Sequence, residues 1–328
     1  MRRALRSGGL VLLVVAAFAA AWVRIPYYAL GPGPAREVLP LIHIDGARTF
    51  ASGGRFVMTT VRFRPITALG AIAAWLDPQQ SVVEEDVLYP AGLTAREEQR
   101  RATSEMDTSK IDAAVVVLSK LTRYPRDHGR GALIERVGEG CPADGALFPG
   151  DLIVRIDGEP VRSVDDAQAL IDGVPPGERV AFRVVAEGDA HDVRLARARC
   201  PGEPEPLVGI SLVESFPFRI SMESDDVGGP SAGLMWALAL YDLLTPGDLT
   251  GGRTVAGTGA IDGAGEVGPI GGVSDKVVGA REVGADILFV PEANAAELRG
   301  IDRSGVRVVA VATFDEALEV LEASERSG

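Results

Sequence analysis

GGPSAGLMWALALYDLL, residues 228–244, constrains the fold most, because it joins a tight turn directly to an apolar helix. Two glycines permit the turn, Pro230 suits a first helical turn, and apolar residues follow from Ala232 at helical spacing. Ser231 is therefore expected at a helix N-terminus. Unpaired backbone N–H groups and the helix dipole there stabilise a negative oxygen, such as the one formed when a hydroxyl attacks an amide carbonyl.

A serine hydroxyl needs a base before it becomes a useful nucleophile. None of the three histidines lies in residues 201–325, so a Ser-His-Asp triad within that region is excluded. Lysine is the other workable base, because burial lowers its pKa whereas arginine stays protonated. The chain uses arginine for nearly all of its positive charge, yet Lys276 stands in the apolar, glycine-rich stretch PIGGVSDKVVGA. This placement indicates a lysine whose proton must be removable.

GGPSAGL, followed by TGAIDGAGEVGPIGGVSDKVVGA and ILFVP, resembles the proteolytic domain of Lon-type proteases in the order and separation of its parts. The resemblance implies that Ser231 is the nucleophile, that Lys276 is the base of a Ser-Lys dyad, and that Thr258 orients the lysine. The backbone that shapes the oxyanion site is expected from Gly229, Pro230 and Ala232.

The sequence departs from the Lon pattern in two ways, which change the expected acidic residue and the expected use of ATP. Many Lon proteases have an aspartate three residues before the serine, where this chain has Gly228, so acidic support is expected from Asp225 or Asp226. No GxxxxGK[ST] phosphate loop occurs, which predicts an ATP-independent enzyme acting on unfolded or flexible segments. A GxGxxG match at 263–268 is followed at once by Pro269, which favours turns over the helix of a nucleotide-dependent oxidoreductase. No cofactor is expected.

Residues 128–200 contain short strands around ALFPGDLIVRIDGEPV, which has a Pro-Gly turn, a buried strand and an Asp-Gly hairpin turn. This order of elements resembles a PDZ domain. The resemblance implies a groove in which an extended peptide adds as a strand, with peptide-binding backbone at Gly131, Ala132 and Leu133. A small β domain that only spaces its neighbours is the alternative.

The N-terminus predicts a membrane segment. Residues 7–23 carry no charge, three arginines precede them, and Arg24 ends the run beside aromatic residues. We expect a retained single-pass anchor in a bacterial cell membrane, with the rest of the chain on the extracytoplasmic side. Cleavage as a signal peptide, near Ala19 to Ala21, is the competing interpretation.

Composition limits the partners. A net charge of -13 argues against nucleic acid, because backbone phosphates require clustered Lys and Arg. Cys141 and Cys200 have no CxxC spacing and predict no zinc or other metal site, although one bridge between them stays open. Polypeptide substrates and the membrane are the expected partners, without ATP, and a hexamer follows only by analogy with Lon rings.

We therefore expect an α+β protein in four parts. These are a membrane anchor, a region of juxtamembrane strands and helices, a PDZ domain and a Lon-like proteolytic domain, at residues 1–27, 28–127, 128–200 and 201–325. Strands are predicted over LIHIDG and FVMTTVRF, and helices over ITALGAIAAWLD and SKIDAAVVVLSKL. The whole resembles the PDZ-containing, YlbL-like Lon proteins of bacteria. The expected function is that of a serine endopeptidase, and the alternative is a catalytically silent membrane-tethered adaptor.

Overall fold

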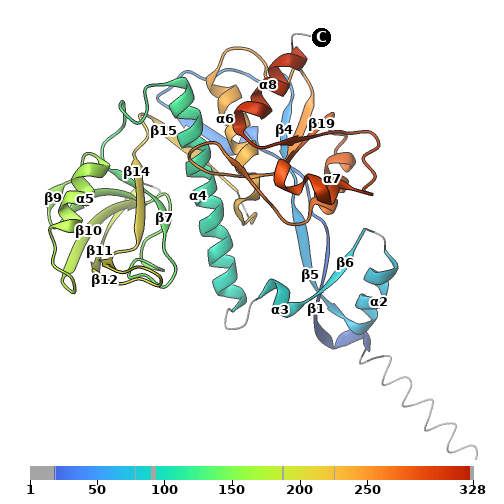
Figure 1. Ribbon diagram of the computed structural model, residues 1–328, viewed down its shortest axis with the longest axis horizontal. Coiled ribbons are helices and arrows are strands. Elements are labelled where there is room, and N and C mark those ends of the chain that lie inside the picture. The colour runs from blue at the N-terminus through green and yellow to red at the C-terminus, as the bar shows by residue number, and fades with distance from the viewer. Residues whose placement is uncertain are drawn as a thin grey trace, which may run out of the picture.

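The computed structural model describes residue 18 and residues 20–77, 79–89, 94–186, 188–224 and 226–325. It confirms an α+β fold. Figure 1 shows a β-rich lobe and an α/β lobe on either side of one long helix, with a small three-stranded sheet at the end of the molecule away from the C-terminus.

The α/β lobe is built on a five-stranded sheet in the order β2-β4-β16-β19-β20, parallel except for β2. Its strands are β2 (Arg36–Glu37), β4 (Arg55–Met58), β16 (Thr254–Gly257), β19 (Ile287–Pro291) and β20 (Arg307–Val311). Helices cover both faces, so β19 is buried along its whole length, as central parallel strands are. One face packs on α6 (Gly233–Leu244) and α8 (Phe314–Glu325), and the other on α7 (Val273–Glu282).

Short elements complete this lobe. They are η1 (Leu39–Leu41), β3 (Ile42–Asp45), β15 (Arg219–Met222), η2 (Pro230–Ala232), β17 (Ala260–Ile261), β18 (Val267–Gly268) and η3 (Glu292–Leu298). Strand β3 pairs with β15, and β17 pairs with β18. Residues 263–268 thus form a turn and a short strand, as predicted for the GxGxxG match.

The three-stranded sheet, in the order β5-β1-β6, contains β1 (Arg24–Pro32), β5 (Val61–Thr67) and β6 (Ser81–Glu84), with α2 (Ala68–Leu76) and α3 (Glu85–Leu88) beside it. The strand prediction over FVMTTVRF is confirmed, but the stretch divides between β4 and β5, which belong to different sheets. The region 28–127 therefore does not form one β layer, because Phe56 and Met58 of β4 are needed in the core beneath α6.

The long helix α4 (Ala95–Leu121) is longer than predicted, because the polar stretch before residue 109 is also helical. Thr94 and Glu97 form a reciprocal capping box that satisfies the first backbone donors. Val117 and Leu118 near its other end are buried in the α/β lobe, so the polar first turns are supported by a buried final portion.

The β-rich lobe has the sheet order β11-β10-β8-β7-β14, with β9 paired to β8. Its elements are β7 (Ala132–Val137), β8 (Leu152–Ile156), β9 (Glu159–Pro160), α5 (Val164–Asp172), β10 (Arg179–Ala186), β11 (Asp189–Ala196), β12 (Ala198–Arg199), β13 (Pro206–Leu207) and β14 (Ile210–Glu214). A disulfide joins Cys141 to Cys200, which answers the question left open by the sequence.

The predicted anchor at residues 1–27 lies mostly outside the described residues. Within the described ranges, no helix combines the length and the apolar composition that crossing a bilayer requires.

Candidate active site

The turn that carries Ser231 is shaped by glycine. Gly229 has φ 81° and ψ 160°, a conformation available almost only to glycine. A Cβ on Gly228 would lie 2.8 Å from the Cβ of Ala102, so the turn also presses closely against α4. Ser231 follows in η2, half-buried and immediately before α6. This agrees with the predicted helix N-terminus.

Hydrogen bonds from two sides hold this turn in place. On the α4 side, the Gly229 N–H donates to the Ala102 carbonyl (2.7 Å) and the Ser109 hydroxyl donates to the Pro230 carbonyl (3.0 Å). On the sheet side, the Ser231 carbonyl accepts from the Gly259 N–H (2.7 Å). Sequence reasoning missed Ser109 and Ala102, because nothing in the pattern of α4 indicates which helix face meets the turn.

Lys276 is buried on α7, with only 3% of its surface exposed. Burial lowers its pKa to about 8, against a smaller opposing effect of the neighbouring Asp275 carboxylate. The helix begins after Gly272, which has φ 70° and packs so closely on Val61 that a Cβ would lie 2.7 Å from that side chain. The close contact fixes the start of α7 and therefore the position of the lysine.

Thr258 connects the two candidate catalytic residues. Its hydroxyl accepts a hydrogen bond from Lys276 Nζ (2.9 Å) and donates one to the Ser231 carbonyl (3.0 Å). Thr258 is fully buried at the end of β16, where its own N–H donates to the Phe289 carbonyl (3.0 Å). Thr258 therefore links the amine of Lys276 to the backbone of Ser231.

The residues predicted to form the oxyanion site and to give acidic support differ from Ser231, Thr258 and Lys276 in how well their positions suit these roles. Pro230 has no N–H, and the Gly229 N–H is already bonded to α4, so neither can donate to an oxyanion. Ala232 is buried at the helix start. Asp226 is exposed, and Asp225 lies outside the described residues.

The predicted peptide-binding residues of the β-rich lobe lie inside its sheet. Ala132 and Leu133 pair with β8 on one side and with β14 on the other, so this strand has no open edge. The Gly131 N–H is also bonded, to the Arg162 carbonyl (3.2 Å). The assignment of peptide binding to Gly131, Ala132 and Leu133 is therefore wrong, because strand addition needs an unpaired edge.

The last strand of that sheet is instead β14, which sequence reasoning placed in the following domain. Helix α5 approaches β14, and the Val164 N–H at its start donates to the Glu214 carboxylate (3.1 Å). The alternation in VGISLVE identifies a strand but cannot say which sheet it joins, so only the fold shows that β14 belongs to the β-rich lobe.

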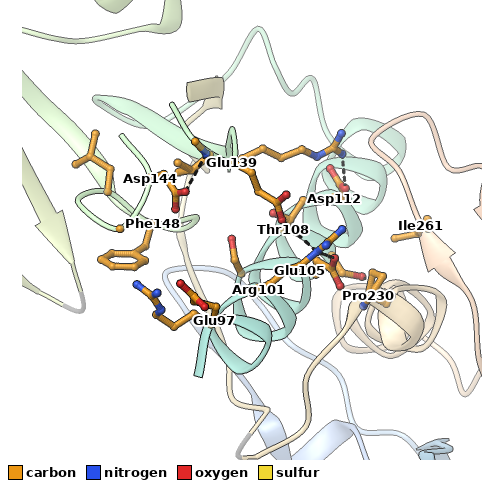
Figure 2. A pocket seen from close by; sticks show the side chains of 18 residues that line it. Glu97, Arg101, Glu105, Thr108, Asp112, Glu139, Asp144, Phe148, Pro230 and Ile261 are labelled. Carbon is orange, nitrogen blue, oxygen red and sulfur yellow. Dashed lines mark hydrogen bonds and ion pairs between the residues drawn. The ribbon is translucent and has the colours of Figure 1, made fainter. Parts of the chain in front are cut away.

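A cavity of about 620 Å³ lies between this lobe, α4 and η2. Figure 2 shows Phe148 and Asp144 of the β-rich lobe at one end and Pro230 and Ile261 at the other, with side chains of α4 between them. Since Pro230 directly precedes Ser231, the cavity reaches the turn that carries the candidate nucleophile. Over the part of the chain described, no group of three or more His, Cys, Asp or Glu side chains could hold a metal ion.

Known protein families match both lobes. Residues 225–324 match the C-terminal proteolytic domain of Lon protease (S16), and residues 133–185 match the PDZ domain. The Lon protease of Roseiflexus castenholzii is 42% identical over 93 residues, which are 27% of this chain and 11% of that protein. Lon protease 2 of Bacillus subtilis is 38% identical over 94 residues, 28% of this chain and 16% of that protein.

A probable periplasmic serine endoprotease, DegP-like, of Hahella chejuensis is 32% identical over 89 residues, 27% of this chain and 19% of that protein. The PDZ domain of the SdrC-like protein of Listeria innocua is 26% identical, covers 25% of this chain and 92% of that one, and gives a TM-score of 0.23. These matches span 11% to 19% of the curated relatives. The chain therefore contains a region that matches the PDZ domain, followed by a region that matches the proteolytic domain of Lon protease.

Proposed function

We propose that this protein is an ATP-independent serine endopeptidase in which Ser231 is the nucleophile and Lys276 the general base. The observation that carries the proposal is the buried amine of Lys276, whose lowered pKa leaves an appreciable neutral fraction near pH 8. Thr258, hydrogen-bonded both to that amine and to the backbone of Ser231, orients the pair.

In the proposed reaction, neutral Lys276 takes the proton of the Ser231 hydroxyl while the oxygen attacks a peptide carbonyl carbon. The C–N bond then breaks, the lysine ammonium gives its proton to the leaving amine, and an ester joins Ser231 to the acyl half. Lys276 next takes a proton from water, which attacks the ester and releases the carboxylic acid. The proton then returns to Ser231.

The tetrahedral oxyanion needs backbone donors. Since Gly229 and Pro230 cannot donate, we assign this role to the N–H groups of Ser231 and Ala232, at the point where η2 leads into α6. The positive end of α6 adds to the stabilisation.

We propose that the PDZ domain binds polypeptide substrates along the edge of β14, beside α5. The cavity lined by α4 would then guide a bound segment towards the Ser231 turn, so the PDZ domain delivers substrate or controls its access. Hydrogen exchange tests the edge: an added peptide should protect amides of β14 and leave those of β7 unchanged. Protection confined to β7 would contradict the assignment.

We further propose that residues 7–23 anchor the chain in a bacterial cell membrane, with both domains on the extracytoplasmic side. The uncharged length of the segment, the preceding arginines and the disulfide support this placement, because disulfides persist in oxidising compartments.

Labelling with a serine-directed fluorophosphonate probe tests the chemistry on the full chain in detergent. We expect the wild type to be acylated, and Ser231→Ala and Lys276→Ala to lose labelling. The matched controls are Ser274→Ala, an exposed serine of α7, and Lys120→Ala, which removes a partly exposed ion pair with Asp315. Labelling that persists in Ser231→Ala would overturn the assignment of the nucleophile, and an unlabelled wild type would favour a silent adaptor.

A further inference from the structure

Helix α2 has an unusual composition for a surface helix. Its sequence, ALGAIAAWL, contains no polar or charged side chain. A nine-residue helix on a thin sheet normally presents polar side chains to water. In Figure 1 it lies on the outer side of the three-stranded sheet, remote from the PDZ domain.

The helix packs with its small residues and exposes its large ones. Ala71 and Ala74 contact the small core formed by Ala29 and Ile66. The exposed residues, which we call the α2 face, are Leu69 (47% exposed), Ile72 (56%), Trp75 (81%) and Leu76 (71%). They recur three or four positions apart and thus share one side of the helix. Exposed apolar surfaces of this kind mark contact sites.

The sheet register places the start of α2 beside the end of the predicted membrane segment. Arg24, which ends the uncharged run of residues 7–23, pairs with Thr67, the N-cap of α2. Paired strands lie about 4.8 Å apart. Trp22 is 73% exposed and Val23 60% exposed, so the apolar surface continues from the segment to the helix.

Basic side chains accompany this surface. Arg62 and Arg64 of β5 are exposed and alternate with Phe63, so they share the sheet face of Ile66, which α2 covers. Arg24 is exposed as well. In a chain of net charge -13, arginines beside an apolar face with tryptophan suit anionic phosphate headgroups above acyl chains.

We propose that the α2 face lies in the headgroup region of the bilayer and attaches the N-terminal sheet to the membrane surface. This inference rests on the proposed membrane anchor and adds a second attachment to it. A single attachment would let the protease tilt freely, whereas two adjacent contacts fix its orientation relative to the membrane.

The three tryptophans of the full chain allow a test by depth-dependent fluorescence quenching. The chain is incorporated into phosphatidylcholine vesicles that contain phosphatidylglycerol and lipids brominated high on their acyl chains. Trp22→Phe leaves Trp75 as the reporter, and Trp22→Phe with Trp75→Phe gives the background of Trp236, which is fully buried in the protease domain. We expect brominated lipid to lower the Trp75 signal by roughly half, as for a side chain just below the headgroups.

The possible outcomes separate the alternatives. Quenching of Trp75 by aqueous iodide but not by lipid would overturn the proposal, and so would protection from both quenchers, which would place another protein surface, such as a second copy, on α2. Trp75→Phe reports on Trp22 in the same vesicles. If Trp22 is quenched by lipid and Trp75 is not, the anchor stands and the α2 contact fails; if the chain does not associate with vesicles, both fail.

Discussion

Two buried ionisable groups, Lys276 on α7 and Asp112 on α4, show how differently a protein uses the same physical effect. Lys276 in the protease domain and Asp112 at the contact between α4 and the PDZ domain are 3% and 2% exposed. Burial is the main cause of both pKa shifts, lowering that of Lys276 to about 8 and raising that of Asp112 to about 7. Each shift favours the uncharged form.

Asp112 and Lys276 differ in their hydrogen-bond partners. Asp112 accepts a hydrogen bond from the Arg136 guanidinium of β7 (2.8 Å), and the neighbouring Glu135 carboxyl further raises the pKa of Asp112. Lys276 has a neutral hydroxyl, that of Thr258, as its partner. A guanidinium stabilises the charge of Asp112 and ties α4 to the PDZ domain, whereas the lysine is left able to give up its proton. Burial alone does not make a catalytic group; the neighbour decides its role.

The largest expected effect comes from removing the titration at Lys276. Lys276→Arg keeps a cation but not a base, because arginine stays protonated at working pH. We expect peptidase activity to fall by about 10³-fold or more, within the range that general-base catalysis supplies. Lys120→Arg, on α4, is the matched control and should retain activity. A Lys276→Arg enzyme with near wild-type turnover would show that the base is another group.

The pH dependence of acylation also tests whether Lys276 is the base. Below its pKa of about 8, Lys276 is increasingly protonated, so the rate of probe labelling should fall about tenfold for each pH unit and level off above pH 8. Labelling rates measured from pH 6 to pH 9 check this. A flat profile between pH 6 and pH 8 would mean that the lysine is not the titrating base.

The contrast also explains what the sequence could predict. Ser231 and Lys276 could be predicted because few residue types can act as nucleophile and base, and Thr258 could be predicted from the resemblance to Lon-type proteases. The sequence did not predict a role for Asp112, because that role depends on Arg136, in a strand of another domain that packs against α4.

The same limit applies to strands. The alternation in VGISLVE is typical of a strand, yet the place of β14 at the edge of the PDZ sheet depends on pairing with β7, far away in sequence. Likewise FVMTTVRF was recognised as extended, but its division between two sheets depends on which core each half enters. Local pattern predicts elements and motifs, whereas tertiary pairing decides which edges and faces remain open.

Stability should reveal the cost of burying the lysine. The folded pKa is about 8 and the unfolded value 10.5, so the unfolded chain holds the extra proton between these values and wild-type stability rises with pH across that window. Lys276→Met removes the free-energy cost of burying a charged amine, because methionine carries no charge. We expect a gain of about 2 kcal/mol below pH 8, after allowance for the lost Thr258 hydrogen bond, fading towards pH 10.5. Thermal unfolding of the two variants, each in a Ser231→Ala background, measures this gain. Equal stabilities at pH 7 would contradict an energetic cost of burying the charged amine.

The effect of Asp112 on stability should have the opposite pH dependence. Its folded pKa of about 7 lies above the ordinary value of 3.8, so the stability contributed by the protonated form is complete below pH 4 and is lost as the pH rises through 7. The side chain of Asp112→Asn cannot ionise, so this variant does not lose stability as the pH rises through 7. It lacks the charge-assisted hydrogen bond to Arg136.

The pKa of about 7 for Asp112 already includes the stabilising effect of Arg136 on the charged form. We expect Asp112→Asn to match the wild type in stability at pH 4 and to be more stable than the wild type at pH 8, because only the wild-type carboxyl ionises between these two pH values. Unfolding midpoints at the two pH values test it, with Asp315→Asn, at an exposed ion pair of α4, as the control. If Asp112→Asn instead lowers stability at pH 8, the pair with Arg136 outweighs desolvation, and the link between α4 and the PDZ domain is electrostatic in origin.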